Sequence, residues 1–112
     1  MMQNLLVRPT VTVVQPTGHI NASSAPEFQQ QLLETVSSDR HSSILVDLSS
    51  VNSLDSAGLM SLVSALTLSQ QLGKRFGICC VPASIRIIFE VTQLDRAFKI
   101  FDTHSAYEMA IA

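Results

Sequence analysis

The sequence contains little charge and no dense group of basic residues. Charged residues make up 14% of the 112 positions and apolar residues 46%. Disordered chains combine few apolar residues with much charge, so we expect a folded chain. The seven lysines and arginines are scattered, and the formal net charge is −2. A nucleic-acid backbone is bound by clustered basic residues, so this distribution argues against a nucleic-acid partner.

Long apolar runs and targeting signals are missing as well. No run reaches the roughly 18 apolar residues of a membrane-spanning helix, so we expect no insertion into a membrane. The first seven residues show no basic start and no cleavage site, which predicts the absence of a signal peptide. Together these features predict a cytoplasmic protein.

The sequence has only two cysteines, Cys79 and Cys80, and they are adjacent. Neighbouring residues on a strand point to opposite faces, so a disulfide between them would be strained. Their spacing is also not that of metal ligands. We therefore expect two reduced thiols packed in a strand, as in a reducing compartment, and neither a metal nor another cofactor.

Catalytic motifs are scarce. The histidines, His19, His41 and His104, are far apart, and none has helical spacing from another ligand, so we interpret them as surface or capping residues. Gly18 stands alone, which excludes a phosphate-binding glycine loop, and there is no Gly-x-Ser-x-Gly elbow. No nucleophile, base and orienting group can be named together, so we expect no catalytic residues and a protein that is not an enzyme.

Apolar and β-branched runs alternate with segments of helical periodicity. Strands are predicted near 11–15, 43–48, 75–81 and 98–101, and Leu5-Leu6-Val7 is either a short strand or a loose end. This order predicts an α/β fold with a mixed, mostly parallel sheet of four to five strands, right-handed crossovers and about four helices. The length fits a single domain over residues 1–112.

Helix starts and the core follow from capping residues and apolar stripes. Ser24 with Glu27 predicts a capping box for a helix over 24–38, and Ser84 and Ser105 are predicted caps of the last two helices. A second helix is expected after Asp55 and ends at Gly73, with Lys74 at its negative end. The predicted core consists of Ile44, Val46, Leu62, Val63, Leu66 and Ile78.

The turn at Asp55, Ser56 and Gly58 is the one concentrated feature. A helix start exposes unpaired N–H groups and a partial positive charge, which favour an acidic or phosphorylated group. Ser56 would lie there, exposed at the carboxyl edge of the sheet, where binding sites of α/β folds gather. A purely structural interpretation remains open, in which Asp55 or Ser56 caps the helix and Gly58 permits close packing.

Three segments carry a resemblance to a known family. Residues 46–51, VDLSSV, followed by 54–59, LDSAGL, resemble the signature of STAS domains in bacterial anti-sigma-factor antagonists. Residues 13–21 resemble the family's first strand and Gly-x-Leu-Asp corner, and residues 85–101 resemble its closing helix and strand. The resemblance runs from about residue 11 to the end.

This resemblance implies a protein-binding switch controlled by phosphorylation. In the family, the serine after the aspartate is phosphorylated by a partner kinase, often itself an anti-sigma factor, and a metal-dependent serine/threonine phosphatase removes the phosphate. The unphosphorylated antagonist binds the anti-sigma factor and frees the sigma factor. Carried across, Ser56 is the phosphoacceptor, and Ser53 is a rival.

The expected partner surface is centred on this serine. Met60 is included because its apolar side chain falls outside the packing stripe of the second helix. The family usually has Asp in place of Asn21, so a charge is lost and partner specificity is expected to differ. It usually has Ser or Thr in place of Ala57, which removes a second hydroxyl but leaves the acceptor, and Gly in place of Gln93, so that turn is expected to take a different shape. The residues expected to bind the partner are Asn21, Asp55, Ser56, Ala57, Gly58 and Met60.

Two other functions keep the same fold. One is a cytosolic accessory STAS protein that docks on a membrane transporter ATPase of the lipid-transport type, and the other is a subunit of a stress-sensing complex. The sequence does not identify the kinase, phosphatase or sigma factor, and it leaves a weak homodimer open.

Overall fold

The computed structural model describes residues 11–111, so the segment Leu5-Leu6-Val7 lies outside the described residues. The described strands are β1 (Val11–Val14), β2 (Gly18–Ile20), β3 (Ser43–Asp47), β4 (Val51–Leu54), β5 (Arg75–Cys79) and β6 (Ile100–Phe101). The helices are α1 (Ala25–Ser37), α2 (Ser56–Gln71), α3 (Ala83–Val91) and α4 (His104–Ile111), with a 3₁₀ turn, η1, at Leu94–Arg96. Within 11–111, no helix combines the length and apolar character needed to cross a membrane.

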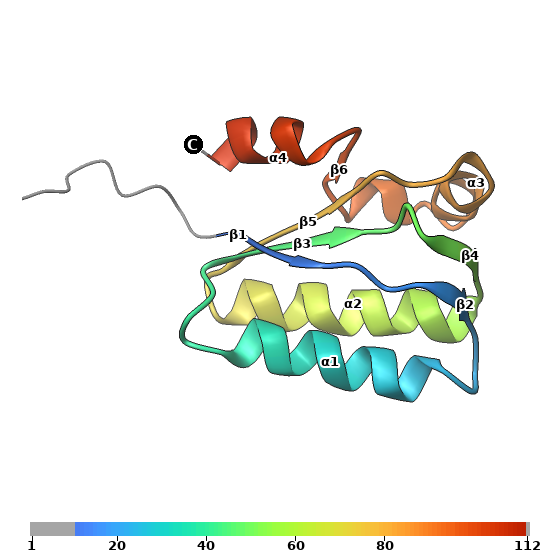
Figure 1. Ribbon diagram of the computed structural model, residues 1–112, viewed down its shortest axis with the longest axis horizontal. Coiled ribbons are helices and arrows are strands. Elements are labelled where there is room, and N and C mark those ends of the chain that lie inside the picture. The colour runs from blue at the N-terminus through green and yellow to red at the C-terminus, as the bar shows by residue number, and fades with distance from the viewer. Residues whose placement is uncertain (1–10, 112) are drawn as a thin grey trace, which may run out of the picture.

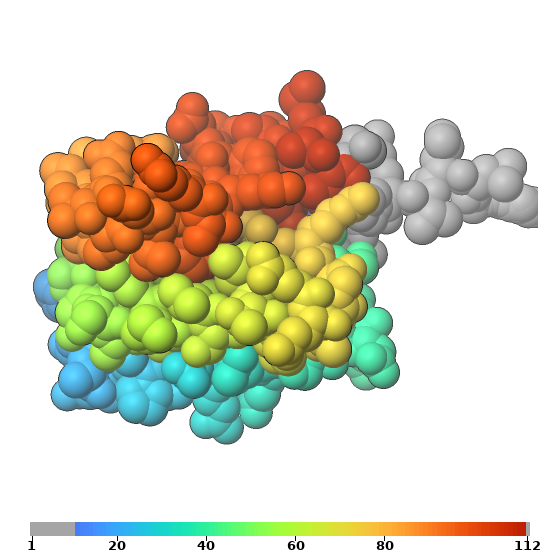
Figure 2. Space-filling model, turned by 180° about the vertical axis from the view of Figure 1, so that it is seen from behind, coloured from blue at the N-terminus to red at the C-terminus, as the bar shows by residue number. Residues whose placement is uncertain are grey.

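The main sheet has the strand order β1-β3-β5-β6, and every pairing in it is parallel. The predicted α/β class and the parallel pairing of the strands at 43–48 and 75–81 are confirmed, with Ser43 opposite Arg75 and Asp47 opposite Cys79. Helices α1 and α2 cover one face of this sheet, and α4 lies over the other (Figure 1). Seen from behind, α2 lies between α1 and the C-terminal elements (Figure 2).

Strands β2 and β4 form a second parallel pair that the sequence did not predict. Neither segment is among the strands predicted from the sequence. Each strand is short, and in β4 the exposed Asn52 and Ser53 separate the buried Val51 and Leu54. This pattern lacks a clear two-residue alternation, so only the pairing partner makes it a strand. The pair matters for function because it ends where α1 and α2 begin.

The predicted core is correct for Ile44, Val46, Leu62 and Ile78, whose side chains have no exposed surface. Val63 and Leu66 are only half-buried, which corrects the predicted orientation of α2. The helix packs against α1 as well as the sheet, so its buried face includes small and polar residues that a count of apolar positions omits. The non-leucine members of this face are Gly58, Ser61, Ala65 and Ser69.

The predicted helix caps fail at three starts. The Ser24 hydroxyl donates to the backbone carbonyl of His19 at 2.8 Å and makes no cap hydrogen bond to α1. The predicted capping box of Ser24 with Glu27 is therefore wrong. Helix α3 begins after Pro82 without a side-chain cap, so Ser84 does not cap it. At α4, the Thr103 hydroxyl accepts from the Ala106 amide at 3.1 Å, so Thr103 takes the role predicted for Ser105.

The end of α2 is close to the prediction. The last helical residue is Gln71, and Gly73 follows with a positive φ of 69°, the left-handed conformation that glycine adopts without strain. Lys74 behaves differently from the prediction. Its ammonium donates to the carbonyls of Val36 and Ser38 at the end of α1, so it compensates the negative end of α1 rather than that of its own helix.

Candidate functional site

Asp55 organises the start of α2. It is the N-cap residue, and its Oδ1 accepts hydrogen bonds from the amides of Ala57 at 2.9 Å and Gly58 at 3.1 Å. Aspartate is among the best residues for this role because its carboxylate satisfies amides that have no partner within the helix. The capping part of the structural interpretation is therefore correct for Asp55.

Ser56 is the first residue of α2, and its side chain is exposed. The rival Ser53 is also exposed but lies within β4, where its hydroxyl is 2.7 Å from Nδ1 of His19 on β2. The two serines therefore differ in setting. Ser56 stands at a helix start, whereas the Ser53 hydroxyl is engaged across a pair of strands.

Gly58 lies beneath this helix start, where β2 and β4 approach α2. A β-carbon at Gly58 would lie 2.4 Å from Cδ1 of Leu54, 2.9 Å from Cγ2 of Ile20 and 3.2 Å from the carbonyl oxygen of Ile20. Glycine is needed because the backbones approach so closely. Gly58 was expected on the partner surface, but it is buried, so its contribution is to packing.

Asn21 turns the chain from β2 into α1. Its Oδ1 accepts from the amides of Ser23 at 2.9 Å and Ser24 at 3.3 Å, and its carbonyl accepts from the Ala25 amide at 2.7 Å. An aspartate could accept the same bonds, so replacing it by asparagine preserves the turn and removes a negative charge from the surface. The exposed Asn21 thus lies at the same end of the molecule as Ser56.

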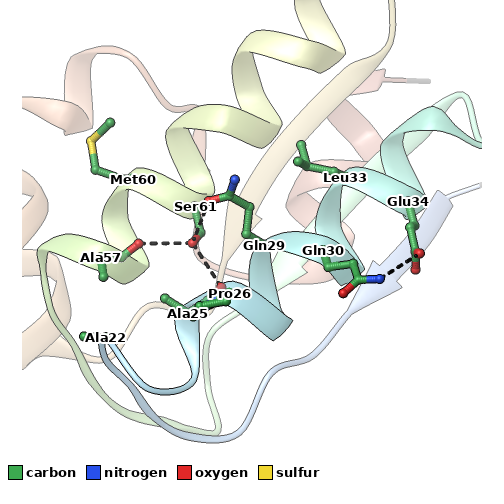
Figure 3. A pocket seen from close by; sticks show the side chains of 10 residues that line it. All are labelled: Ala22, Ala25, Pro26, Gln29, Gln30, Leu33, Glu34, Ala57, Met60 and Ser61. Carbon is green, nitrogen blue, oxygen red and sulfur yellow. Dashed lines mark hydrogen bonds between the residues drawn. The ribbon is translucent and has the colours of Figure 1, made fainter.

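A mostly apolar groove of about 720 Å³ runs between α1 and the first turns of α2. Figure 3 shows Met60 and Ala57 on one side and Pro26 on the other, with Ala22 at the end nearest the turn before α1. Met60 is 58% exposed, as expected for a residue off the packing stripe. The groove places adaptable apolar surface directly beside Ser56.

The predicted site residues therefore divide into two groups. Asn21, Asp55, Ser56 and Met60 are exposed, and Ala57 is half-buried at the groove, so these five form one continuous end of the molecule. We call this region the α2 start surface. Gly58 supports it from below.

Sequence reasoning missed a separate cluster of potential metal ligands. Donor atoms of Asp47, Cys79, Cys80 and His104 all lie within 4.8 Å of one another. The two cysteines are not both in a strand as predicted, because β5 ends at Cys79 and Cys80 has a positive φ of 60°. Their sulfur atoms are 3.4 Å apart. Cys79 follows Asp47 by 32 residues and His104 follows it by 57, so the sequence shows no local spacing that would reveal the cluster. Only the fold brings these side chains together.

A parallel sheet with α1 and α2 on one face and α4 over the other (Figure 1), and with an exposed serine at a capped helix start, defines a class of small α/β domain. The STAS domain family matches residues 3–106. The chain belongs to this family.

Several named proteins are similar to this chain in sequence or structure. A Thermotoga neapolitana protein provisionally named an anti-sigma factor antagonist is 28% identical over 95 residues, which cover 85% of this chain and 84% of that protein. The crystal structure of the Thermotoga maritima protein TM1081, with the same provisional assignment, has a TM-score of 0.84 at 25% identity, over 90% of this chain and 86% of that one. An anti-sigma factor antagonist from Mycobacterium paratuberculosis has a TM-score of 0.80 at 28% identity, over 90% and 85%.

Proposed function

We propose that this chain is a phosphorylation-controlled protein-binding switch of the anti-sigma-factor-antagonist type. In its unphosphorylated form it binds an anti-sigma factor that is also a serine kinase, and phosphorylation of Ser56 releases that partner. A serine/threonine phosphatase restores the binding form. The chain acts in the cytoplasm as a binding module and carries out no catalysis of its own.

The exposed position of Ser56 beside the groove is the observation that carries this proposal. A kinase needs an accessible hydroxyl, and Ser56 offers one at the first residue of α2. Met60 and the groove supply apolar surface next to it for a partner to cover. Modification of Ser56 would therefore act at an interface and not in the core.

The local electrostatics favour an effect on the partner. A phosphoserine carries a charge of about −1.5 to −2 at neutral pH. The Asp55 carboxylate already accepts hydrogen bonds from the amides of Ala57 and Gly58. A phosphate on Ser56 would therefore lie beside a negative group and would find fewer free amides than at the start of an uncapped helix. It would remain largely hydrated at the surface. A partner covering Ser56 would have to strip this water from a dianion, which opposes binding.

Ser53 is the weaker candidate for the acceptor. Its hydroxyl is engaged with His19, and its strand is paired with β2, so a kinase would have to displace both contacts to reach it. The serine at the helix start requires no such rearrangement.

The test begins with capture of binding partners from the native cell on the unmodified chain. The captured kinase is then purified and incubated with the chain and ATP, and mass spectrometry locates the phosphate. We expect phosphate on Ser56 and loss of the kinase from the complex. Phosphate on Ser53 alone would move the switch to β4. No phosphate with a kinase proven active on another substrate, together with capture of a transporter ATPase, would support the accessory-protein function instead.

A further inference from the structure

Four potential metal ligands meet at the carboxyl edge of the main sheet. Asp47 is the last residue of β3, Cys79 is the last residue of β5 and lies opposite it in register, and Cys80 follows directly. His104 is the first residue of α4, and its Nε2 lies 2.7 Å from Oδ2 of Asp47. All four donor atoms lie within 4.8 Å of one another.

The backbone at Cys80 creates this arrangement. An extended residue after Cys79 would point to the opposite face, but the positive φ of 60° turns Cys80 back, and the two sulfur atoms come within 3.4 Å. The Cys80 amide donates to the carbonyl of Phe101 at 3.2 Å, which holds this turn against β6. A left-handed conformation at a residue other than glycine is costly and often marks a functional site.

The cluster is buried on one side and contains one carboxylate. Asp47 and Cys79 are buried, whereas Cys80 and His104 are half-exposed, so the cluster is anchored inside and open to solvent on one side. Burial acts to raise the pKa of Asp47, but hydrogen bonds from Ser49 and His104 outweigh it and hold that pKa below its ordinary value. Burial raises the pKa of the Cys79 thiol to about 12, so a metal would have to displace its proton, as zinc does when it binds cysteine.

The donor set selects the metal. Two sulfurs, one imidazole nitrogen and one carboxylate oxygen match the ligands of tetrahedral zinc, whereas calcium and magnesium require mostly oxygen. Around tetrahedral zinc, with bonds of about 2.0–2.3 Å, donor atoms lie roughly 3.3–3.8 Å apart. The sulfur pair, at 3.4 Å, is already near this separation, and His104 would move away from Asp47 from 2.7 Å. The most widely spaced donor atoms, up to 4.8 Å apart, would move toward each other by roughly 1 Å.

We propose that Asp47, Cys79, Cys80 and His104 bind one zinc ion. The ion would tie the start of α4 to the carboxyl ends of β3 and β5. This helix lies on the opposite face of the sheet from α1 and α2 (Figure 1), so the site is separate from the α2 start surface. The proposal is therefore independent of the phosphorylation switch.

The test uses the full chain, reduced, stripped of metal and titrated with zinc alone in competition with a chromophoric chelator. We expect one zinc ion per chain and a higher melting temperature in its presence. Cobalt(II) serves as the spectroscopic probe, and we expect the visible bands of a tetrahedral ion with a thiolate charge-transfer band in the near ultraviolet.

Two variants each remove one half-exposed ligand, Cys80→Ser and His104→Ala, and His19→Ala is the matched control. Loss of an outer-shell partner typically weakens metal binding about 10- to 100-fold, so loss of a ligand should weaken it by more than about 100-fold. The control should bind as the parent chain does. Circular dichroism of the metal-free variants checks folding, and either variant suffices if the other fails to fold.

Three results would overturn the proposal. The first is zinc binding no tighter than that of the double variant lacking both Cys80 and His104. The second is a cobalt spectrum without a thiolate band. The third is rapid conversion of the reduced chain in air to a disulfide between Cys79 and Cys80, detected as the loss of two hydrogens, even with zinc present. That result would assign the paired thiols to redox chemistry.

Discussion

The backbone amide of Asp55 donates a hydrogen bond to the carbonyl oxygen of Ile20 at 3.1 Å. This bond extends the β2–β4 pairing to the first residue before α2, while the Asp55 side chain caps the same helix. The position of Ser56 is therefore determined by a strand more than 30 residues earlier in the chain as well as by its own helix. The predictions for the switch depend on this arrangement.

Replacing Gly58 by alanine should destabilise the domain by about 1–3 kcal/mol, as expected for overpacking. Alanine normally stabilises a helix interior relative to glycine by roughly 0.5–1 kcal/mol, so the packing against Ile20 must outweigh that gain. The Cγ2 and carbonyl oxygen of Ile20 cannot move as freely as the end of Leu54. Chemical denaturation measures the change, with the exposed Thr67→Ala in the same helix as control. Equal or greater stability of Gly58→Ala would show that β2 can move away from α2.

Replacing Ser56 by aspartate should weaken partner binding with little change in stability, whereas Ser56→Ala should bind constitutively and resist the kinase. An unfavourable charge in a buried contact typically costs about 2–5 kcal/mol, or roughly 30- to several-thousand-fold in affinity. Calorimetry with the captured kinase and a thermal melt measure both quantities. Ser53→Asp is the matched control. A larger loss of affinity for Ser53→Asp than for Ser56→Asp would contradict Ser56 as the switch.

Replacing Met60 by aspartate should leave the thermal melt nearly unchanged and abolish capture of the partner. The side chain is 58% exposed and lines the groove, so the substitution affects the docking surface and leaves the core intact. Met109→Asp is the matched control, because Met109 is 79% exposed on α4, over the other face of the sheet. Unfolding of Met60→Asp, or equal loss of binding in both variants, would place the partner surface elsewhere.

Replacing Leu62 by alanine should cost roughly 2–5 kcal/mol of stability, the range for a fully buried leucine. The sequence placed Leu66 in the same core, but Leu66 is half-buried, so Leu66→Ala should cost clearly less. The two variants are a matched pair within one helix, compared by denaturant midpoints. Equal costs would mean that α2 is rotated toward the orientation predicted from its apolar stripe.

Local sequence determined much of this protein. Continuous apolar runs fit strands buried on both faces, and together with the alternating order of strands and helices they predicted β3, β5 and their parallel pairing correctly. The aspartate before a helix start is a capping signal in itself, and it located Ser56 on the surface. The exposure of Met60 followed from helical periodicity alone.

Tertiary structure decided the rest. The strands β2 and β4 exist only because each has the other as a hydrogen-bonding partner, and this pairing determines why Gly58 must be glycine. The buried face of α2 depends on α1, which accepts small and polar side chains that hydrophobicity cannot detect. The cluster of Asp47, Cys79, Cys80 and His104 required the register of β3 with β5, the left-handed turn at Cys80 and the return of α4 over the sheet. Contacts between residues so distant in the chain have no local periodicity, because they are formed by the packing of whole elements.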